Sequence, residues 1–333
     1  MKKYDVYGIG NALVDIEVQV QPQFFEELKI HKGVMTLIEQ KRQKEILSKI
    51  NGQALKKASG GSAANSMLTI AQFGGNSYYA CKVADDDLGD FFHADLLRGG
   101  VETNGSIIRD KGDTGTCLVM VTPDADRTMN TYLGITEHFG IKELEEDVLR
   151  NSEFIYIEGY LLAQQTGRKA ISEALKMAQK YNLKKVLSFS DPFIVSSYEK
   201  EMKDIIDHGM DLIFCNEDEA KMFAGTNDTK TASDKLKHFT KNFVITLGAE
   251  GSLIYDGEEQ RYYKIEGHKI NAVDTTGAGD VYAGAFIYAI THQYSTYAAG
   301  RLASLSSAKV VSRYGPRLTQ AEVCAAIREV PKS

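Results

Sequence analysis

Short runs of β-branched and aromatic residues alternate with segments of helical period along most of this chain, and this alternation constrains the fold more than any other feature. Phe154–Glu158 and Leu212–Cys215 have the length and composition of buried strands, and the helical segments Thr166–Tyr181 and Glu217–Ala224 follow them. Repeated strand–helix units form a parallel sheet that helices cover on both faces. The sequence therefore predicts an α/β fold with a doubly wound, mostly parallel sheet, with ligands at the carboxyl ends of its strands.

The same patterns place the other elements of the main fold. Further strands are expected at Tyr4–Ile9, Ser77–Val83, Lys185–Phe189, Phe243–Thr246 and Ser252–Tyr255. Further helices are expected at Lys41–Ile50, Ala63–Phe73, Asp87–Arg98, Lys142–Asn151, Thr231–Phe239, Asp280–Thr291, Tyr297–Val311 and Gln320–Glu329.

Two stretches depart from this alternation of strands and helices. Leu13–Val20 alternates apolar and polar residues, and Thr116–Thr131 is also strand-like. Alternation leaves one face of a strand in contact with water. We therefore expect a small β-sheet that projects from the main domain and acts as a lid, with segments at about residues 13–40 and 114–136 inserted in a single domain of residues 1–333. The alternative is an antiparallel edge of the main sheet.

Composition excludes several classes of protein. The formal charge is −6, from 39 basic and 45 acidic side chains, and no run of Lys or Arg indicates a nucleic-acid partner. The four cysteines form no CxxC pair, so neither a zinc site nor a disulfide framework is expected. The N-terminus has no signal-peptide pattern, and the apolar run Val281–Ile290 is shorter than the ~20 residues that span a bilayer. We expect a cytoplasmic protein without a membrane partner.

The segment Asp274–Asp280 carries the strongest chemical signal. Gly277 and Gly279 permit backbone conformations that other residues avoid, and a helix that begins there directs unpaired N–H groups at one spot. Such an anion hole beside the Asp280 carboxylate suits phosphoryl transfer to an alcohol, because the carboxylate accepts the hydroxyl proton. The alternative is that Asp280 is simply a helix N-cap.

A second segment, Ser59–Asn65, joins a Gly-Gly turn to a helix of small residues. Small side chains let a ligand approach the backbone, and Asn65 lies one turn inside the helix, where its amide can bond a diol. The alternative is an ordinary tight turn.

A third segment, Thr246–Ser252, connects two strands. Its glycines Gly248 and Gly251 suit a loop around nucleotide phosphates, but a glycine-containing hairpin is an equal alternative.

A fourth segment begins at Asn216, after a predicted strand. Asn216 and Glu219 lie on one helical face, and a carboxylate in this position commonly holds magnesium through water. The alternative is a capped helix with a solvated acidic first turn.

Together these segments resemble the ribokinase-like family of carbohydrate and nucleoside kinases. The matches are Gly60–Asn65 continued by Ala71–Gly75, the Asn-x-x-Glu motif at Asn216 and Glu219, the loop Thr246–Gly251, and Asp274–Asp280. They occur in the family's order and extend over nearly the whole chain. The resemblance implies a ribokinase-like fold with a small β-lid, an ATP-dependent reaction, magnesium, and often a monovalent cation such as K⁺.

The resemblance also implies roles for individual residues. Asp280 takes the position of the catalytic base, with the N–H groups of Gly277, Ala278 and Gly279 as the anion hole. Positions that bind the substrate are Asn11, Leu13, Asp15, Gly61, Ser62, Asn65, Tyr160 and Phe193. Positions that bind ATP are Asn216, Thr246, Gly248, Gly251, Gly277 and Gly279. Glu219 matches the magnesium position, and Asp274 and Thr276 match positions for the monovalent cation.

Within the family the chain is most similar to the adenosine kinase branch. The similarity rests on Gly10–Ile16, Thr114–Cys117, Gly159-Tyr160 and Asp191–Ile194. A nucleoside pocket needs a diol clamp and a flat apolar slot. Asp15 and Asn65 suit the clamp, and Leu13, Tyr160 and Phe193 suit the slot by stacking. The alternative is that these last three are core residues.

Three functions therefore stay open. The first is an ATP-dependent kinase that phosphorylates the 5′-hydroxymethyl group of a nucleoside such as adenosine. The second is a sugar kinase that acts on a free pentose or hexose. The third is a non-catalytic nucleotide or sugar sensor. We expect a small-molecule substrate and ATP as ligands, and a monomer or a homodimer.

Overall fold

The strands of the main sheet run in the order β14-β13-β12-β11-β10-β9-β1-β5-β6. The structure is a computed structural model that describes residues 2–50, 54–104, 109–123 and 127–333. The sheet comprises β1 (Tyr4–Ile9), β5 (Ser77–Ala80), β6 (Glu102–Thr103), β9 (Ser152–Glu158), β10 (Lys184–Ser188), β11 (Met210–Asn216), β12 (Thr240–Thr246), β13 (Gly251–Asp256) and β14 (Arg261–Glu266). The strands from β12 to β6 pair in parallel, and β12, β13 and β14 pair antiparallel. The predicted mostly parallel sheet is confirmed.

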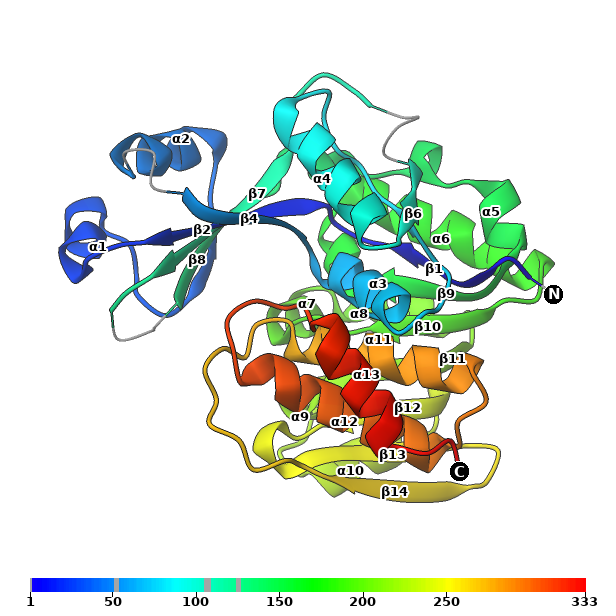
Figure 1. Cartoon of the computed structure of the whole chain (residues 1–333). Helices are drawn as coiled ribbons and strands as arrows, with labels where there is room; N and C mark the ends of the chain where they lie inside the picture. Colours follow the sequence, from blue (N-terminus) through cyan, green and yellow to red (C-terminus); the bar gives the residue numbers. More distant parts are fainter. Residues whose placement is uncertain (1, 51–53, 105–108, 124–126) are drawn as a thin grey trace.

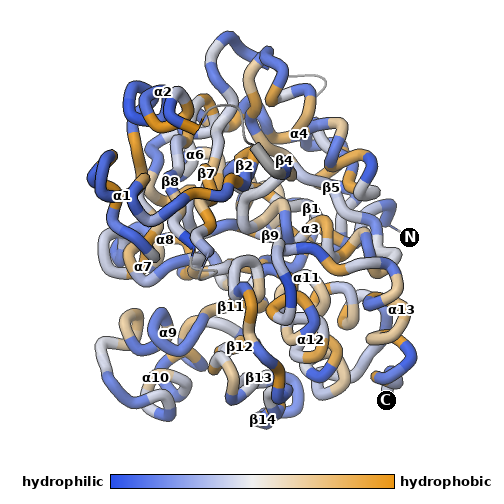
Figure 2. The backbone as a smooth tube through the Cα atoms, turned by 60° about the vertical axis from the view of Figure 1, so that its left-hand side comes forward, coloured by the Kyte–Doolittle hydropathy of each residue, from blue (hydrophilic) through white to orange (hydrophobic). Residues whose placement is uncertain are grey.

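Helices cover both faces of this sheet because successive strand residues point to opposite sides. In β9, Phe154 and Tyr156 join one apolar core, and Ile155 and Ile157 join the other. The first face carries α3 (Ser62–Gln72), α4 (Asp87–Arg98), α11 (Ala278–Thr291), α12 (Thr296–Val311) and α13 (Gln320–Glu329). The second carries α5 (Glu146–Arg150), α6 (Gln165–Lys180), α7 (Pro192–Ser197), α8 (Glu199–Ile206), α9 (Glu217–Ala224) and α10 (Thr229–Leu236). Figure 2 shows hydrophilic stretches along the outer helices α9 and α10.

A second sheet, which we call the small sheet, projects from the main body (Figure 1). Its order is β3-β8-β7-β2-β4, with β2 (Leu13–Gln19), β3 (Met35–Leu37), β4 (Ala54–Gly60), β7 (Gly115–Val121) and β8 (Arg127–Tyr132). The helices α1 (Pro22–Leu28) and α2 (Gln40–Lys49) cover the face to which the apolar residues of β2 point. The small sheet is therefore separate, and the alternative of an edge of the main sheet is wrong. Its closure as a lid stays a prediction.

Some elements differ from the sequence patterns for local reasons. β4 has no β-branched residue and lies outside the two predicted lid segments; it is extended because it pairs antiparallel with β2. Residues 124–126, in the second predicted lid segment, lie outside the described residues. The predicted helix Lys142–Asn151 is broken, because the N–H of Glu145 donates to the hydroxyl of Tyr7 instead of continuing a helix.

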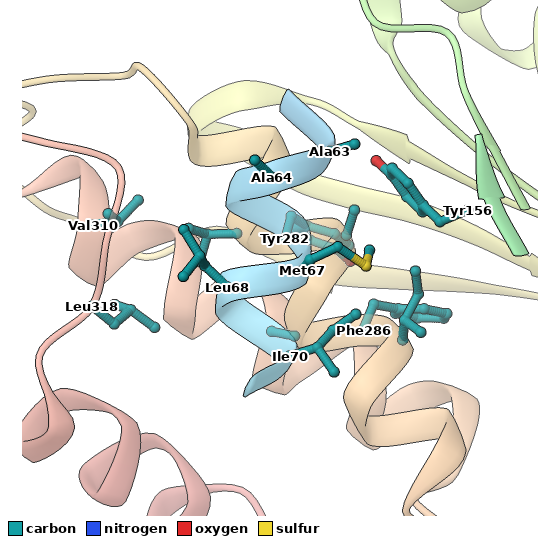
Figure 3. Packing of buried hydrophobic residues seen from close by; sticks show 14 of the residues in the cluster. Ala63, Ala64, Met67, Leu68, Ile70, Tyr156, Tyr282, Phe286, Val310 and Leu318 are labelled. Carbon is teal, nitrogen blue, oxygen red and sulfur yellow. The ribbon is translucent and has the colours of Figure 1, made fainter. Parts of the chain in front are cut away.

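Helices α3 and α11 lie in close contact, and this contact brings the first residues of α3 beside the first residues of α11. Figure 3 shows Met67 and Ile70 of α3 packed toward Tyr282 and Phe286 of α11. A Cβ on Gly284 would lie 2.6 Å from the backbone oxygen of Ser66, so only glycine permits this spacing. The N-termini of the two helices consequently meet at one side of the sheet.

Among the described residues, none of the helices combines the length and the apolar composition that crossing a bilayer requires. The most apolar candidate from the sequence, α11, has 14 residues and is buried inside the protein.

We predict that Gly284→Ala destabilises the fold. The added methyl improves helix propensity by about 1 kcal/mol, but it overlaps a backbone oxygen, and overpacking of this kind costs about 1–3 kcal/mol. Because the overlapped atom is backbone and cannot rotate away, we expect a cost in the upper part of this range, so the free energy of unfolding, measured with urea, should fall by about 1–2 kcal/mol. The exposed Lys176→Ala on α6 is the control and should stay within about 0.5 kcal/mol of the wild type. A Gly284→Ala protein as stable as the wild type would show that the spacing of the helices is not critical.

Candidate active site

The loop before α11 presents backbone N–H groups to the surface. Gly277 is the N-cap of α11 with φ 76°, and a Cβ there would overlap Pro316, so glycine is required. The N–H of Ala278 donates to the carbonyl of Thr275 at 3.2 Å. Within the described residues, the N–H groups of Gly277 and Gly279 have no partner. Two of the three predicted anion-hole donors are thus available to a ligand, and Ala278 is engaged in the turn.

Asp280 lies in the first turn of α11 and is held by residues from α3. Its Oδ1 accepts the hydroxyl of Ser62 at 2.6 Å, and its Oδ2 accepts the amide of Asn65 at 3.0 Å. Burial raises the pKa of Asp280 to about 6, while the bonds from Ser62 and Asn65 lower it. The N-cap is Gly277, so the alternative that Asp280 caps the helix is wrong. The carboxylate is placed and tuned as a proton acceptor near neutral pH.

Asn65 has spare hydrogen-bonding capacity that points to a ligand. Its side chain is 5% exposed, and among the described residues its Oδ1 has no hydrogen-bond donor. A buried acceptor without a partner costs roughly 1–3 kcal/mol. A hydroxyl group of a bound substrate would satisfy it while the amide nitrogen of Asn65 stays on Asp280.

Asp15 stands beside this position on β2 of the small sheet. A Cβ on Gly60 would overlap the carboxyl group of Asp15, and a Cβ on Gly61 would overlap the carbonyl of Asn11. The two glycines therefore let the carboxylate approach the start of α3. Loss of surrounding water raises the pKa of Asp15 to about 7, against the lowering effect of the Arg317 guanidinium. Asp15 therefore lies beside the Gly60-Gly61 turn that begins α3, and its role with Asn65 in a diol clamp stays a prediction.

Glu158, at the carboxyl end of β9, was not expected from the sequence. It is 1% exposed, and its two oxygens accept the N–H groups of Asn11 at 3.2 Å and Ala63 at 2.8 Å. Burial raises its pKa to about 7, although these two bonds lower it. The carboxylate joins the loop after β1 to the start of α3. An acidic residue closing an apolar strand just before Gly159 was the available signal.

Asn11 is buried and already engaged inside the protein. Its Oδ1 accepts the amide of Gln164 at 2.9 Å, and its carbonyl accepts the hydroxyl of Tyr79 at 2.8 Å. These contacts fix the loop that leads into β2. In this structure Asn11 therefore supports the clamp through its backbone and side chain together.

Asp191 organises the predicted aromatic slot. Its Oδ1 accepts the N–H of Phe193 at 2.7 Å, and its Oδ2 accepts the hydroxyl of Tyr160 at 3.4 Å. Phe193 is 61% exposed on α7, whereas Tyr160 and Leu13 are half-buried. Phe193 is therefore not a core residue, and its ring is free to be covered by a ligand.

A cavity of about 770 Å³ lies beside the anion hole. Four of the predicted ATP-binding residues line it, namely Thr246, Gly248, Gly251 and Gly279. The loop is a hairpin turn between β12 and β13, so that alternative is confirmed, and the binding of nucleotide phosphates stays a prediction. The volume is in the range of small-ligand sites. Sequence patterns missed the wall formed by residues 267–272, which has no secondary-structure signal.

The predicted magnesium position, Glu219, is a buried helix-capping residue. Its oxygens accept the backbone N–H of Asn216 at 2.9 Å and the side-chain amide of Asn216 at 2.8 Å. Burial raises its pKa to about 7, and the nearby Asp191 and Asp218 raise it further. The alternative of a capped helix is thus confirmed, but its acidic first turn is not solvated at Glu219, which is buried. The carboxylates of Glu219 and Asp191 lie near each other, and such a pair can bind a cation. Each carboxylate oxygen of Glu219 retains a lone pair that can orient a metal-bound water.

Asp274, which was predicted with Thr276 to bind a monovalent cation, already bonds groups of the protein itself. Asp274 Oδ1 accepts the N–H of Thr276 at 3.0 Å, and its Oδ2 accepts the N–H of Gly315 at 3.0 Å. The Arg127 guanidinium lies 3.2 Å from the same Oδ2. In the part of the chain that the structure describes, no cluster of three or more His, Cys, Asp or Glu side chains forms a metal site.

Comparison with known proteins gives a consistent picture. A family model described as pfkB family carbohydrate kinase matches residues 34–322. A probable sugar kinase from Rhizobium etli CFN 42 has TM-score 0.90 and 33% identity, with 99% of each chain covered. An adenosine kinase from Sinorhizobium meliloti has TM-score 0.88 and 35% identity, over 98% of this chain and 100% of that one. A ribokinase from Staphylococcus aureus (strain COL) is 28% identical over 71% of this chain and 75% of its own length.

The pKa of Asp280 leads to a prediction about pH. Activity should rise with pH through about 6 as the carboxylate ionises. Ser62→Ala removes a hydrogen bond that stabilises the ionised form, so this acid limb of kcat/KM should move to higher pH. Ser233→Ala on α10 is the control and should leave the pH profile unchanged.

Asp280→Asn should lower kcat by ~10²–10⁴-fold, because the variant lacks a proton acceptor. Near-normal turnover of that variant would exclude Asp280 as the base.

Glu219 leads to a prediction about magnesium. Glu219→Gln should raise the magnesium concentration that gives half-maximal rate, because an oriented water would face a neutral side chain. Glu322→Gln is a matched control, since Glu322 caps a different helix, α13, in the same capping-box geometry. It should lower stability without changing the magnesium requirement. Equal magnesium curves for both variants would remove Glu219 from the metal site.

Proposed function

Because this chain belongs to the pfkB family of carbohydrate kinases, we propose that its ATP-dependent reaction phosphorylates the 5′-hydroxymethyl group of a nucleoside, with adenosine as the preferred acceptor. The observation that carries the proposal is that Asp191 bonds both the hydroxyl of Tyr160 and the backbone N–H of Phe193, which brings the start of α7 to Tyr160 while the Phe193 side chain stays exposed. A free sugar offers no flat surface to cover the exposed Phe193 ring. The 35% identity to an adenosine kinase supports the same acceptor.

The chemistry follows from the groups at the start of α11. Asp280 accepts the proton of the acceptor hydroxyl as that oxygen attacks the γ-phosphorus of ATP. The free N–H groups of Gly277 and Gly279 stabilise the negative charge on the phosphoryl group in transfer. Magnesium, when bound, neutralises charge on the phosphates; Glu219 would hold one of its waters. The intact base also argues against a non-catalytic sensor.

The acceptor is oriented by the diol clamp. Asp15 accepts hydrogen bonds from the vicinal hydroxyls, and the orphan Oδ1 of Asn65 accepts another. Since the amide of Asn65 also bonds Asp280, a bound diol is positioned relative to the base through one side chain. Positioning of this kind converts binding energy into rate.

A free sugar is the second candidate acceptor. The similar proteins include a ribokinase and a probable sugar kinase, and the clamp suits any vicinal diol. The clamp therefore supports both acceptors, and only the aromatic slot distinguishes them.

A phosphorylation screen with ATP and magnesium tests the acceptor. Adenosine should exceed ribose and fructose in kcat/KM, because stacking of a base on an aromatic ring contributes ~1–3 kcal/mol. Phe193→Ala should lower kcat/KM for adenosine by roughly tenfold to a hundredfold and leave ribose nearly unchanged. Tyr297→Ala, another exposed aromatic, is the control and should affect neither. Ribose or fructose turning over faster than every nucleoside would contradict the proposal and favour the sugar kinase.

A further inference from the structure

We propose that the Arg127 guanidinium supplies the positive charge that family resemblance assigns to a monovalent cation at Asp274, and that Arg127 thereby positions the anion-hole loop. Arg127 begins β8 of the small sheet, whereas Asp274 precedes α11 in the main domain. Its Nη1 lies 3.2 Å from Asp274 Oδ2. The kinase should consequently need no potassium ion for activity.

The Asp274 carboxylate is fully enclosed by donors. It is buried, and it accepts the N–H of Thr276 on one oxygen and the N–H of Gly315 on the other. The Arg127 guanidinium forms an ion pair with the oxygen that accepts the N–H of Gly315. A cation at this carboxylate would have to displace one of these donors and repel the guanidinium. The Arg127 guanidinium thus already places a positive charge beside Asp274, where a cation would otherwise lie.

Asp274 connects the two segments that shape the anion hole. The bond to Thr276 fixes the residue before Gly277, and the bond to Gly315 fixes the residue before Pro316. Gly277 packs so closely on Pro316 that a Cβ would overlap it. The direction of the free N–H groups in the hole therefore depends on how Asp274 is held.

Arg127 is itself firmly placed. Its side chain is 11% exposed, its Nη2 lies 3.4 Å from Glu17 Oε2, and its guanidinium lies 5.3 Å from the ring centroid of Tyr314. Tyr314 adjoins Gly315, so the same guanidinium contacts the loop in two ways. A planar guanidinium can make these contacts together, which a spherical ion cannot. The small sheet thereby joins the loop that stabilises the transferring phosphoryl group.

Breaking this pair would leave a buried carboxylate without its cation. Removal of one partner of a buried ion pair is strongly unfavourable, because the remaining charge is desolvated and unpaired. The loop would then relax, and displacement of catalytic groups by about 1 Å can reduce rate by about 10²-fold. A small external cation would be able to enter the space that the guanidinium leaves.

The experiment compares cations at constant ionic strength, with ATP, magnesium and the best acceptor from the screen. The wild-type rate in potassium chloride and in tetramethylammonium chloride should agree within about twofold, since the larger ion cannot enter a compact site. Arg127→Ala should lose roughly 10²-fold in kcat and regain part of it with potassium or with guanidinium at a non-denaturing concentration. Arg127→Lys, which keeps a charge, should lose less.

A second measurement does not depend on turnover. Potassium chloride in place of tetramethylammonium chloride should leave the thermal unfolding temperature of the wild type unchanged and raise that of Arg127→Ala. Arg150→Ala, which removes a surface guanidinium paired with Asp147, is the control and should behave like the wild type. The proposal would be overturned if the wild-type rate were several-fold higher in potassium chloride than in tetramethylammonium chloride. So would an Arg127→Ala protein whose rate and unfolding temperature respond to cations as the wild type does.

Discussion

The hydrogen bonds from Ser62 and Asn65 to Asp280 are the interaction on which the site depends. They join residues that are more than 200 positions apart in the chain, and they exist only because α3 and α11 approach closely at Gly284. The small residues at this helix contact therefore have a chemical consequence. They place the base of one motif within reach of the polar side chains of the other.

Several carboxyl groups around this contact carry raised pKa values for the same reason. Burial dominates at Asp15, Glu158 and Asp280, and local hydrogen bonds or guanidinium groups offset it only in part. Their roles nevertheless differ by what each carboxylate touches. Glu158 bonds backbone N–H groups and holds the clamp together, whereas Asp280 faces the anion hole. Such clustering of shifted carboxyl groups is typical of functional sites.

Fold and site were predictable to different extents. Periodicity alone placed most strands of the main sheet, because burial on both faces leaves continuous apolar runs such as Phe154–Glu158. It missed the four edge strands β3, β4, β6 and β14, which are short or contain several charged residues. Asp280 and Asn65 were predictable because their motifs also encode turns and helix starts. Glu158 was not, because an acidic residue before Gly159 marks the end of the strand but does not tell whether its carboxylate is buried.

The sequence by itself determined the alternation of strands and helices, the glycine positions that demand unusual backbone angles, and the choice of Asp280 as the candidate base. Local conformational preference and hydrophobic pattern suffice for these, because each acts within a few residues. Only the tertiary structure decided the partners of the charged groups. It joined Asp274 to Arg127 and gave Asp191 both Tyr160 and Phe193. The energies of ion pairs and hydrogen bonds depend on the distance between the groups and on their burial. Both the distance and the burial are set only when segments that are remote in the chain pack together.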